Sequence, residues 1–181
     1  MGLRQHALQA KVTFKELRSF DEALLEQLHA VEVSAHADPW SKEDIAQSMS
    51  PFTHCIGLFI DDLLIGFTIT SLVVDEGELY TIGVNPKYQG LGFGHRLLHM
   101  ALWHLQQLGA RTCFLEVRVS NEVAIHLYDY YGFETLAVRT HYYPATETTP
   151  CEDAFVMSCA LEKLPELPEA LVAYGDKLQQ Q

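Results

Sequence analysis

Three glycines at alternate positions stand between a β-like run and a helix-like run. They lie in Gln89-Gly90-Leu91-Gly92-Phe93-Gly94, after a strand expected over 78–84 and before a helix expected over 95–108. Glycine lets the backbone approach a ligand without an intervening Cβ, and a helix N-terminus adds unpaired N–H donors and a positive partial charge. The arrangement predicts an anion site, most naturally for a pyrophosphate. An ordinary glycine-rich turn is the alternative.

The spacing of these glycines excludes the common nucleotide-binding motifs. No Lys-Ser or Lys-Thr pair follows the last glycine, which excludes a Walker A loop. Leu97 stands where a dinucleotide-binding fingerprint requires its third glycine. The loop alone therefore leaves the identity of the anion open.

The rest of the chain alternates strand and helix patterns around this loop. Strands are expected at 11–17, 54–60, 64–74, 78–84, 112–117, 133–140 and 154–161, and helices at 21–35, 42–49, 95–108 and 121–131. Ser41 and Asp44 are expected to cap the second helix as a capping box. Short turns between the second, third and fourth strands indicate an antiparallel meander. The order predicts an α/β fold with a mixed, mostly antiparallel central sheet and helices on both faces.

Length and composition indicate a single globular domain. The chain has 181 residues, of which 48% are apolar, enough to bury one core. We expect one domain over residues 1–161 and a C-terminal tail over 162–181 that holds one short helix at 169–178. Acidic residues outnumber basic ones 24 to 12, which argues against a nucleic-acid partner and suits a neutral small substrate or a basic peptide.

Several absences point to the cytoplasm. No run of residues is long and apolar enough for a membrane span, and the N-terminus lacks the apolar core of a secretory signal. The four cysteines form no C-x-x-C pair, as expected for free thiols in a reducing compartment. We therefore expect a cytoplasmic protein with no membrane partner.

Two residues after the loop are candidates for acid–base chemistry. Glu116 shares a strand face with Phe114 and Arg118. A carboxylate in a half-apolar strand can serve as a general base, although a surface ion pair with Arg118 is the more common arrangement. Tyr128 follows the spacing of an apolar helix face, which indicates core packing, but a phenol can also protonate a leaving group. Asn121 precedes the same helix and could be its N-cap.

Other catalytic motifs are absent from the sequence. His95 and His99 lie four residues apart on one expected helix, but no Glu follows the first and no third ligand is evident. The sequence therefore predicts no metal site. A G-x-S-x-G nucleophile elbow is absent as well.

The glycine loop is similar to the Q/R-x-x-G-x-G/A acetyl-CoA signature of the GNAT superfamily of N-acetyltransferases. Over about residues 12–161, further short motifs in matching order and spacing resemble the bacterial RimI-type ribosomal-protein-alanine N-acetyltransferases. These motifs are His36-Ala37-x-Pro39-Trp40-Ser41, Leu115-Glu116-Val117-Arg118, Ser120-Asn121-x-x-Ala124, Leu127-Tyr128, Gly132-Phe133, Tyr142-Tyr143-Pro144 and Glu152-Asp153-Ala154. The resemblance implies a GNAT fold.

The resemblance also implies roles for the matching residues. Acetyl-CoA would be the co-substrate, Glu116 the general base and Tyr128 the general acid. The implied cofactor-binding residues are Ile82, Gly83 and Val84 through the strand backbone, the loop Gln89, Gly90, Leu91, Gly92, Phe93, Gly94 and His95, and Asn121.

The implied reaction is a direct attack on the thioester by the N-terminal alanine amine of a small-subunit ribosomal protein that begins Ala-Arg. An α-amine has a pKa of about 7.7–8.0, so a useful fraction is neutral at pH 7. Asp75-Glu76-Gly77-Glu78 and Glu152-Asp153 could receive the substrate arginine, or could be solvated turns. Two alternatives stay open: a GNAT enzyme that acetylates a small-molecule amine or a lysine side chain, and a CoA-binding module without catalysis.

Overall fold

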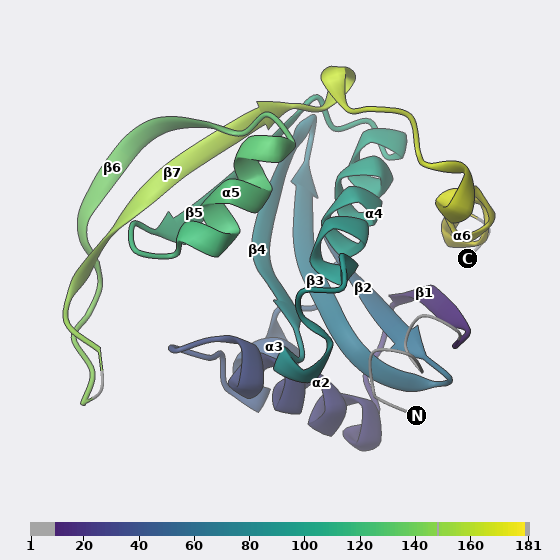
Figure 1. Ribbon diagram of the computed structural model, residues 1–181, viewed down its shortest axis with the longest axis horizontal. Coiled ribbons are helices and arrows are strands. Elements are labelled where there is room, and N and C mark those ends of the chain that lie inside the picture. The colour runs from purple at the N-terminus through teal and green to yellow at the C-terminus, as the bar shows by residue number, and fades with distance from the viewer. Residues whose placement is uncertain (1–9, 148, 180–181) are drawn as a thin grey trace.

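A seven-stranded sheet forms the centre of the computed structural model, which describes residues 10–147 and 149–179 (Figure 1). The strands follow the order β1-β2-β3-β4-β5-β7-β6. Among the described strands, β4 and β5 form the only parallel pair, and all other neighbours are antiparallel. The strands are β1 (Val12–Leu17), β2 (Thr53–Ile60), β3 (Leu63–Val73), β4 (Glu76–Val84), β5 (Thr112–Arg118), β6 (Glu134–Tyr143) and β7 (Glu152–Ala160).

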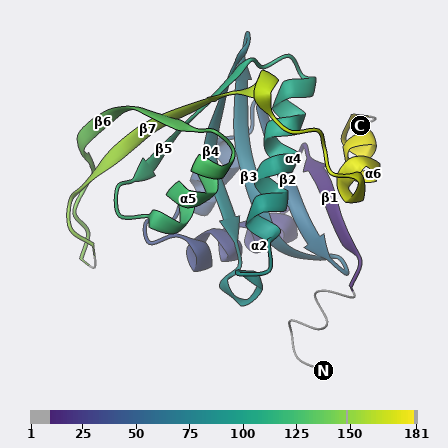
Figure 2. The same ribbon diagram turned by 45° about the horizontal axis from the view of Figure 1, so that its top comes forward.

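Helices cover both faces of the sheet, as the sequence predicts (Figures 1 and 2). The helices are α2 (Glu22–Ala35), α3 (Lys42–Gln47), α4 (Phe93–Gln107), α5 (Glu122–Tyr130) and α6 (Glu169–Gln179), with short 3-10 turns at Pro86–Tyr88 and Leu161–Lys163. Apolar residues of α2 and α3 form one core cluster against β2 and β3. Residues of α4, α5 and α6 form two clusters on the opposite face. None of these described helices has the length and apolarity that crossing a bilayer would require.

Local sequence signals set most of the element ends. The Ser41 hydroxyl accepts from Asp44 N–H while the Asp44 carboxylate accepts from Ser41 N–H, so the expected capping box is confirmed. Asp61 and Asp62 both have positive φ (47° and 69°) and join β2 to β3 in a two-residue hairpin. Aspartate tolerates this left-handed backbone better than most residues. Gly109 (φ 102°) follows Leu108, the C-cap of α4, and a left-handed glycine at this position commonly ends a helix.

Several expected boundaries are wrong. Helix α4 begins at Phe93 rather than 95, so the last part of the glycine segment is already helical. Strand β4 begins at Glu76 rather than 78, so Glu76 and Gly77 of the expected 75–77 turn belong to the strand. Asp75 is the one acidic residue that stays in the turn. Strands β6 and β7 pair as far as Tyr143 and Glu152, so the aromatic pair 142–143 and the acidic pair 152–153 lie on strands rather than in a loop. The polar residues at these strand ends predict a loop, but hydrogen bonding between β6 and β7 keeps them in the sheet.

The helix expected at 169–178 is α6, and it packs against the first strand. Leu171 and Leu178 are each 2% exposed and belong to the same core cluster as Phe14 of β1. The Tyr174 ring meets the Phe14 ring edge-on, with centroids 5.4 Å apart. In Figure 1, α6 lies beside β1 at the edge of the molecule. The helix therefore closes the outer end of the core beside α4.

Candidate active site

The sheet is split between its two parallel strands. Strands β4 and β5 pair only over Glu76–Leu79 and Thr112–Leu115, although β4 continues to Val84 and β5 to Arg118. The β3–β4 register shifts at this point, because Ile69 pairs with Thr81 and Thr70 pairs with Leu79. Tyr80 is thus an extra residue in β4, and a bulge of this kind bends a strand and increases its twist. The pairing of the two strands ends at Leu79 and Leu115, and Figure 2 shows β4 and β5 diverging.

The diverging part of β4 contains the three strand residues that the family resemblance implies for cofactor binding. Ile82, Gly83 and Val84 pair with β3 on one side and lie beyond the last pair with β5 on the other. Backbone N–H and C=O groups on that second edge can therefore serve a ligand instead of a strand. The bound ligand would occupy the place that a continued β5 would otherwise take.

The glycine loop leads from this edge into an uncapped helix. Gly90 (φ 73°) and Gly92 (φ 81°) both have left-handed backbone, which L-residues adopt only at a cost. Gly92 is the N-cap of α4 and gives it no side-chain cap, and the first helical turn holds no acidic residue. Among the residues that the structure describes, no side chain thus caps the first N–H groups of this 15-residue helix, as anion binding requires.

Three of the expected cofactor residues have structural contacts of their own. The Gln89 amide donates a 2.8 Å hydrogen bond to the Val84 carbonyl and so ties the loop to the end of β4. Asn121 caps α5, and its side-chain oxygen accepts from Ala124 N–H at 3.2 Å. The carbonyl of His95 accepts from the Tyr131 hydroxyl at 2.8 Å, which joins α4 to the end of α5. These contacts position the loop and the two helix ends around it.

The expected surface pair between Glu116 and Arg118 is wrong. Glu116 forms its ion pair with Arg139 of β6, at 2.6 Å, and its side chain is 18% exposed. Arg118 instead contacts Glu152 at 3.2 Å and Asp38 at 3.5 Å. Sequence spacing could not reveal these partners, because Arg139 lies on β6 and Glu152 on β7. Strand pairing brings both to β5 from 20 or more residues away.

Tyr128 fulfils the core-packing expectation and is also a suitable proton donor. It is 6% exposed, and its ring packs 5.6 Å from that of Phe133. Burial raises the pKa of Tyr128, and the neighbouring Tyr143 raises it further. The hydroxyl therefore stays protonated at neutral pH. The pKa of Tyr143 is raised by burial and by Glu116 and lowered by Arg118, so this one phenol interacts with both candidate catalytic groups.

Aromatic and charged side chains that the sequence did not single out as catalytic surround Glu116. Its hydrogen bond with Tyr142 raises the pKa of that tyrosine to about 12. Partial burial raises the pKa of Glu78, and the Glu116 carboxylate raises it further. The Arg118 guanidinium lies 4.0 Å from the centre of the Tyr143 ring. Arg118 thus links the α2–α3 loop, which holds Asp38, to the paired ends of β6 and β7.

The left-handed glycine at the start of α4 allows a matched test of the anion site. Gly92 and Gly109 lie at opposite ends of this helix, both have positive φ, and an added Cβ would meet nothing within 4 Å at either. We expect Gly92→Ala and Gly109→Ala each to lower the free energy of unfolding by about 1–2 kcal/mol. Gly92→Ala alone should raise the KM for acetyl-CoA, by roughly 10-fold, about 1.4 kcal/mol of lost binding. Equal KM values for the two variants would contradict the site.

The fold matches a solved enzyme along almost its whole length. It is similar to the crystal structure of the ribosomal-protein-S18-alanine N-acetyltransferase from Escherichia coli, with a TM-score of 0.76 and 34% identity. The match covers 87% of this chain and 99% of that one. The split sheet, the glycine-led helix and this likeness define an acyltransferase.

The family follows from the sequence comparison. The sequence model of the acetyltransferase (GNAT) family matches residues 17–133, and the chain belongs to this family. Its enzymes take the acetyl group from acetyl-CoA. The chain is 36% identical over 142 residues to the [ribosomal protein bS18]-alanine N-acetyltransferase of Escherichia coli K12, covering 78% of this chain and 95% of that protein. Its counterpart in Haemophilus influenzae is 38% identical over 136 residues, 75% of this chain and 92% of that protein.

Proposed function

We propose that this protein transfers the acetyl group of acetyl-CoA to the N-terminal alanine of the small-subunit ribosomal protein bS18. The observation that carries the proposal is the 36–38% identity to enzymes named for this reaction, over nearly their full length. The split between β4 and β5 supports it, because it offers a place for the thioester next to Glu116. A ribosomal substrate would also place the protein in the cytoplasm, as expected from the sequence.

The proposed reaction uses the residues around the split in a single displacement. Glu116 takes a proton from the α-ammonium group, directly or through a water, and the neutral amine attacks the thioester carbonyl. Backbone N–H groups near Val84 stabilise the oxyanion that forms. As the amide forms, the attacking nitrogen loses its second proton to solvent. The C–S bond breaks, Tyr128 gives its proton to the departing CoA thiolate, and Glu116 and Tyr128 then return to their starting protonation states by proton exchange with solvent. Holding both substrates in one geometry supplies a large share of the rate.

The acidic residues near the site favour a positively charged peptide start. Glu152 already accepts from Ser120 N–H (2.7 Å) and pairs with Arg118, and Asp153 accepts from His141 N–H (2.8 Å). Within the described chain, no such hydrogen bond or ion pair holds the Glu78 carboxylate. Partial burial and the nearby Glu116 carboxylate raise the pKa of Glu78, and Arg139 lowers it. We therefore assign the second, arginine residue of an Ala-Arg start to Glu78 rather than to the 152–153 pair.

Mass spectrometry of peptides incubated with the protein and acetyl-CoA tests the proposal. The substrates are a peptide with the Ala-Arg start of the ribosomal protein, the same peptide starting Ala-Ala, an α-blocked peptide with an internal lysine, and a polyamine. We expect one acetyl group on the free α-amine only, with kcat/KM about 10-fold lower for the Ala-Ala start, equal to about 1.4 kcal/mol. Glu78→Gln should remove most of that preference, whereas Glu152→Gln, which alters an internal contact, should retain it.

Three other outcomes of this experiment would each change a different part of the proposed function. Acetylation of lysine or polyamine alone would retain the family and its donor but overturn the substrate. Acetyl-CoA binding without transfer to any amine would indicate a CoA-binding module. Equal rates for the two peptide starts would overturn the assignment of Glu78 while leaving the α-amine substrate in place.

A further inference from the structure

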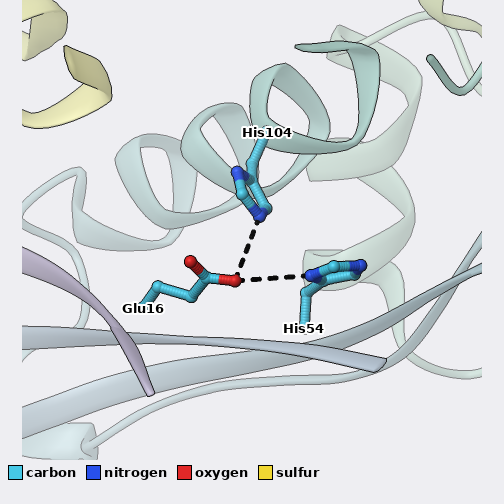
Figure 3. A group of neighbouring side chains, drawn as sticks. All are labelled: Glu16, His54 and His104. Carbon is cyan, nitrogen blue, oxygen red and sulfur yellow. Dashed lines mark hydrogen bonds and ion pairs between the residues drawn. The ribbon is translucent and has the colours of Figure 1, made fainter. Parts of the chain in front are cut away.

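Three side chains from distant parts of the sequence meet beneath the last turns of α4. Glu16 comes from β1, His54 from β2 and His104 from α4, and their carboxylate and ring nitrogens point toward one another in Figure 3. One donor atom from each lies within 4.8 Å of the others. Among the described residues, no other set of three His, Cys, Asp or Glu has this property. His104 is 12 residues beyond Gly92, or about 18 Å along the helix, so the cluster is separate from the anion site.

The spacing of the donor atoms is close to that of a tetrahedral metal site. The Glu16 Oε1 atom lies 3.4 Å from His54 Nδ1 and 3.6 Å from His104 Nε2. Zinc binds histidine nitrogen at about 2.0–2.1 Å and carboxylate oxygen at about 2.0–2.2 Å, so two ligands of one tetrahedral ion lie roughly 3.3–3.5 Å apart. The donor atoms of His54 and His104 lie within 4.8 Å of each other.

His104 points independently to a missing partner. Its side chain is 4% exposed, Nδ1 has no hydrogen-bond partner among the described residues, and Nε2 has only the 3.6 Å ion-pair contact with Glu16. A buried polar group without a partner is costly, and such groups in native proteins usually have an ion, a water or a functional role. The other carboxylate oxygen of Glu16 accepts from Arg18 Nη2 (3.2 Å) and Nε (3.4 Å), which leaves Oε1 directed at the two histidines.

We propose that Glu16, His54 and His104 bind one zinc ion. Two imidazoles and one carboxylate are a known zinc donor set, and a water molecule would take the fourth position. Magnesium, which prefers an all-oxygen shell, would not bind there. The His54 side chain is 17% exposed and gives the ion a route from solvent. The ion would join β1 and β2 to α4 and thus stabilise the fold without taking part in acetyl transfer.

Direct binding and stability measurements on the full-length protein without an affinity tag test this site. Zn²⁺ should bind one ion per chain in calorimetry, and Zn²⁺ should raise the unfolding temperature because it binds only the folded state. Co²⁺ in its place should give the intense visible absorption of a tetrahedral site. Glu16→Gln and His54→Ala should each weaken Zn²⁺ binding by at least about 10-fold and abolish the cobalt spectrum.

His126→Ala is the matched control, because His126 is an exposed histidine on α5 that is outside the cluster. This variant should bind Zn²⁺ as the unaltered protein does. Glu16→Gln keeps the shape of the side chain and His54 is partly exposed, so both variants should fold, which circular dichroism would verify. Absence of binding at one ion per chain, or unchanged binding in Glu16→Gln and His54→Ala, would overturn the proposal. Both results are independent of the acetylation assay.

Discussion

Replacing Glu116 by glutamine should lower kcat for peptide acetylation by about 100-fold or more, the range attributed to a positioned general base. Glutamine keeps the size of the side chain but cannot accept a proton from the substrate ammonium group. The loss should be greatest well below the α-amine pKa of about 7.7–8.0, where almost all of the substrate amine is charged. The rate should be followed from about pH 6 to 9, with acetyl-CoA binding measured in parallel and expected to be unchanged.

Arg139→Gln separates this role from a purely structural one. The ion pair between Glu116 and Arg139 involves a half-exposed arginine (57%), and such pairs contribute about 1 kcal/mol or less to stability. If the pair were the only function of Glu116, then Glu116→Gln and Arg139→Gln would reduce stability and turnover alike. We expect Arg139→Gln to retain most of the turnover that Glu116→Gln loses. Unchanged turnover in Glu116→Gln across the pH range would remove it as the base.

Tyr128→Phe should slow acetyl transfer by about 10- to 100-fold. This loss is at or below the roughly 100-fold lower limit of the rate enhancement typical of a general acid. The effect is smaller than for the base because a thiolate, whose conjugate thiol has a pKa near 8.5, leaves more readily than an alkoxide. The raised pKa of Tyr128 keeps its hydroxyl protonated at neutral pH. The fold-loss should therefore be nearly the same from about pH 6 to 9, unlike that of Glu116→Gln.

Stability measurements distinguish this role from packing alone. Phenylalanine retains the ring contact with Phe133, so the free energy of unfolding should change by less than about 1 kcal/mol. Tyr130→Phe is the matched control on the same helix, because Tyr130 is 72% exposed and lies outside the core. Single-turnover formation of the acetylated peptide is the measurement. A wild-type rate in Tyr128→Phe would leave Tyr128 with its packing role only.

Features encoded within a few residues could be predicted from the sequence. The capping box at Ser41 and the hairpin at Asp61–Asp62 depend on neighbouring backbone groups, so the chain itself specifies them. The glycine loop before a helix predicts an anion site from equally local features, and this site stays a prediction. Element order predicted the mixed sheet with helices on both faces, because apolar periodicity determines which faces must be buried.

Features that depend on strand pairing could not be predicted. The ion partner of Glu116 is Arg139, and Glu152 is held by Arg118, because β5, β7 and β6 align residues far apart in the sequence. The bulge at Tyr80 that splits β4 from β5 is a property of register, which no single strand specifies. Only a bent β4 opens the gap beside Glu116 that we propose for the thioester.

By itself, the sequence determined the order of the elements, the glycine-led helix and the family resemblance, since each depends on short spacing along one chain. The tertiary structure alone decided which side chains lie next to one another. Glu16, His54 and His104 are 38 and 50 residues apart along the chain and became neighbours only when β1 and β2 packed under α4. Long-range packing brings together side chains whose spacing carries no periodic signal, and it thereby places both the proposed base and the proposed zinc ligands.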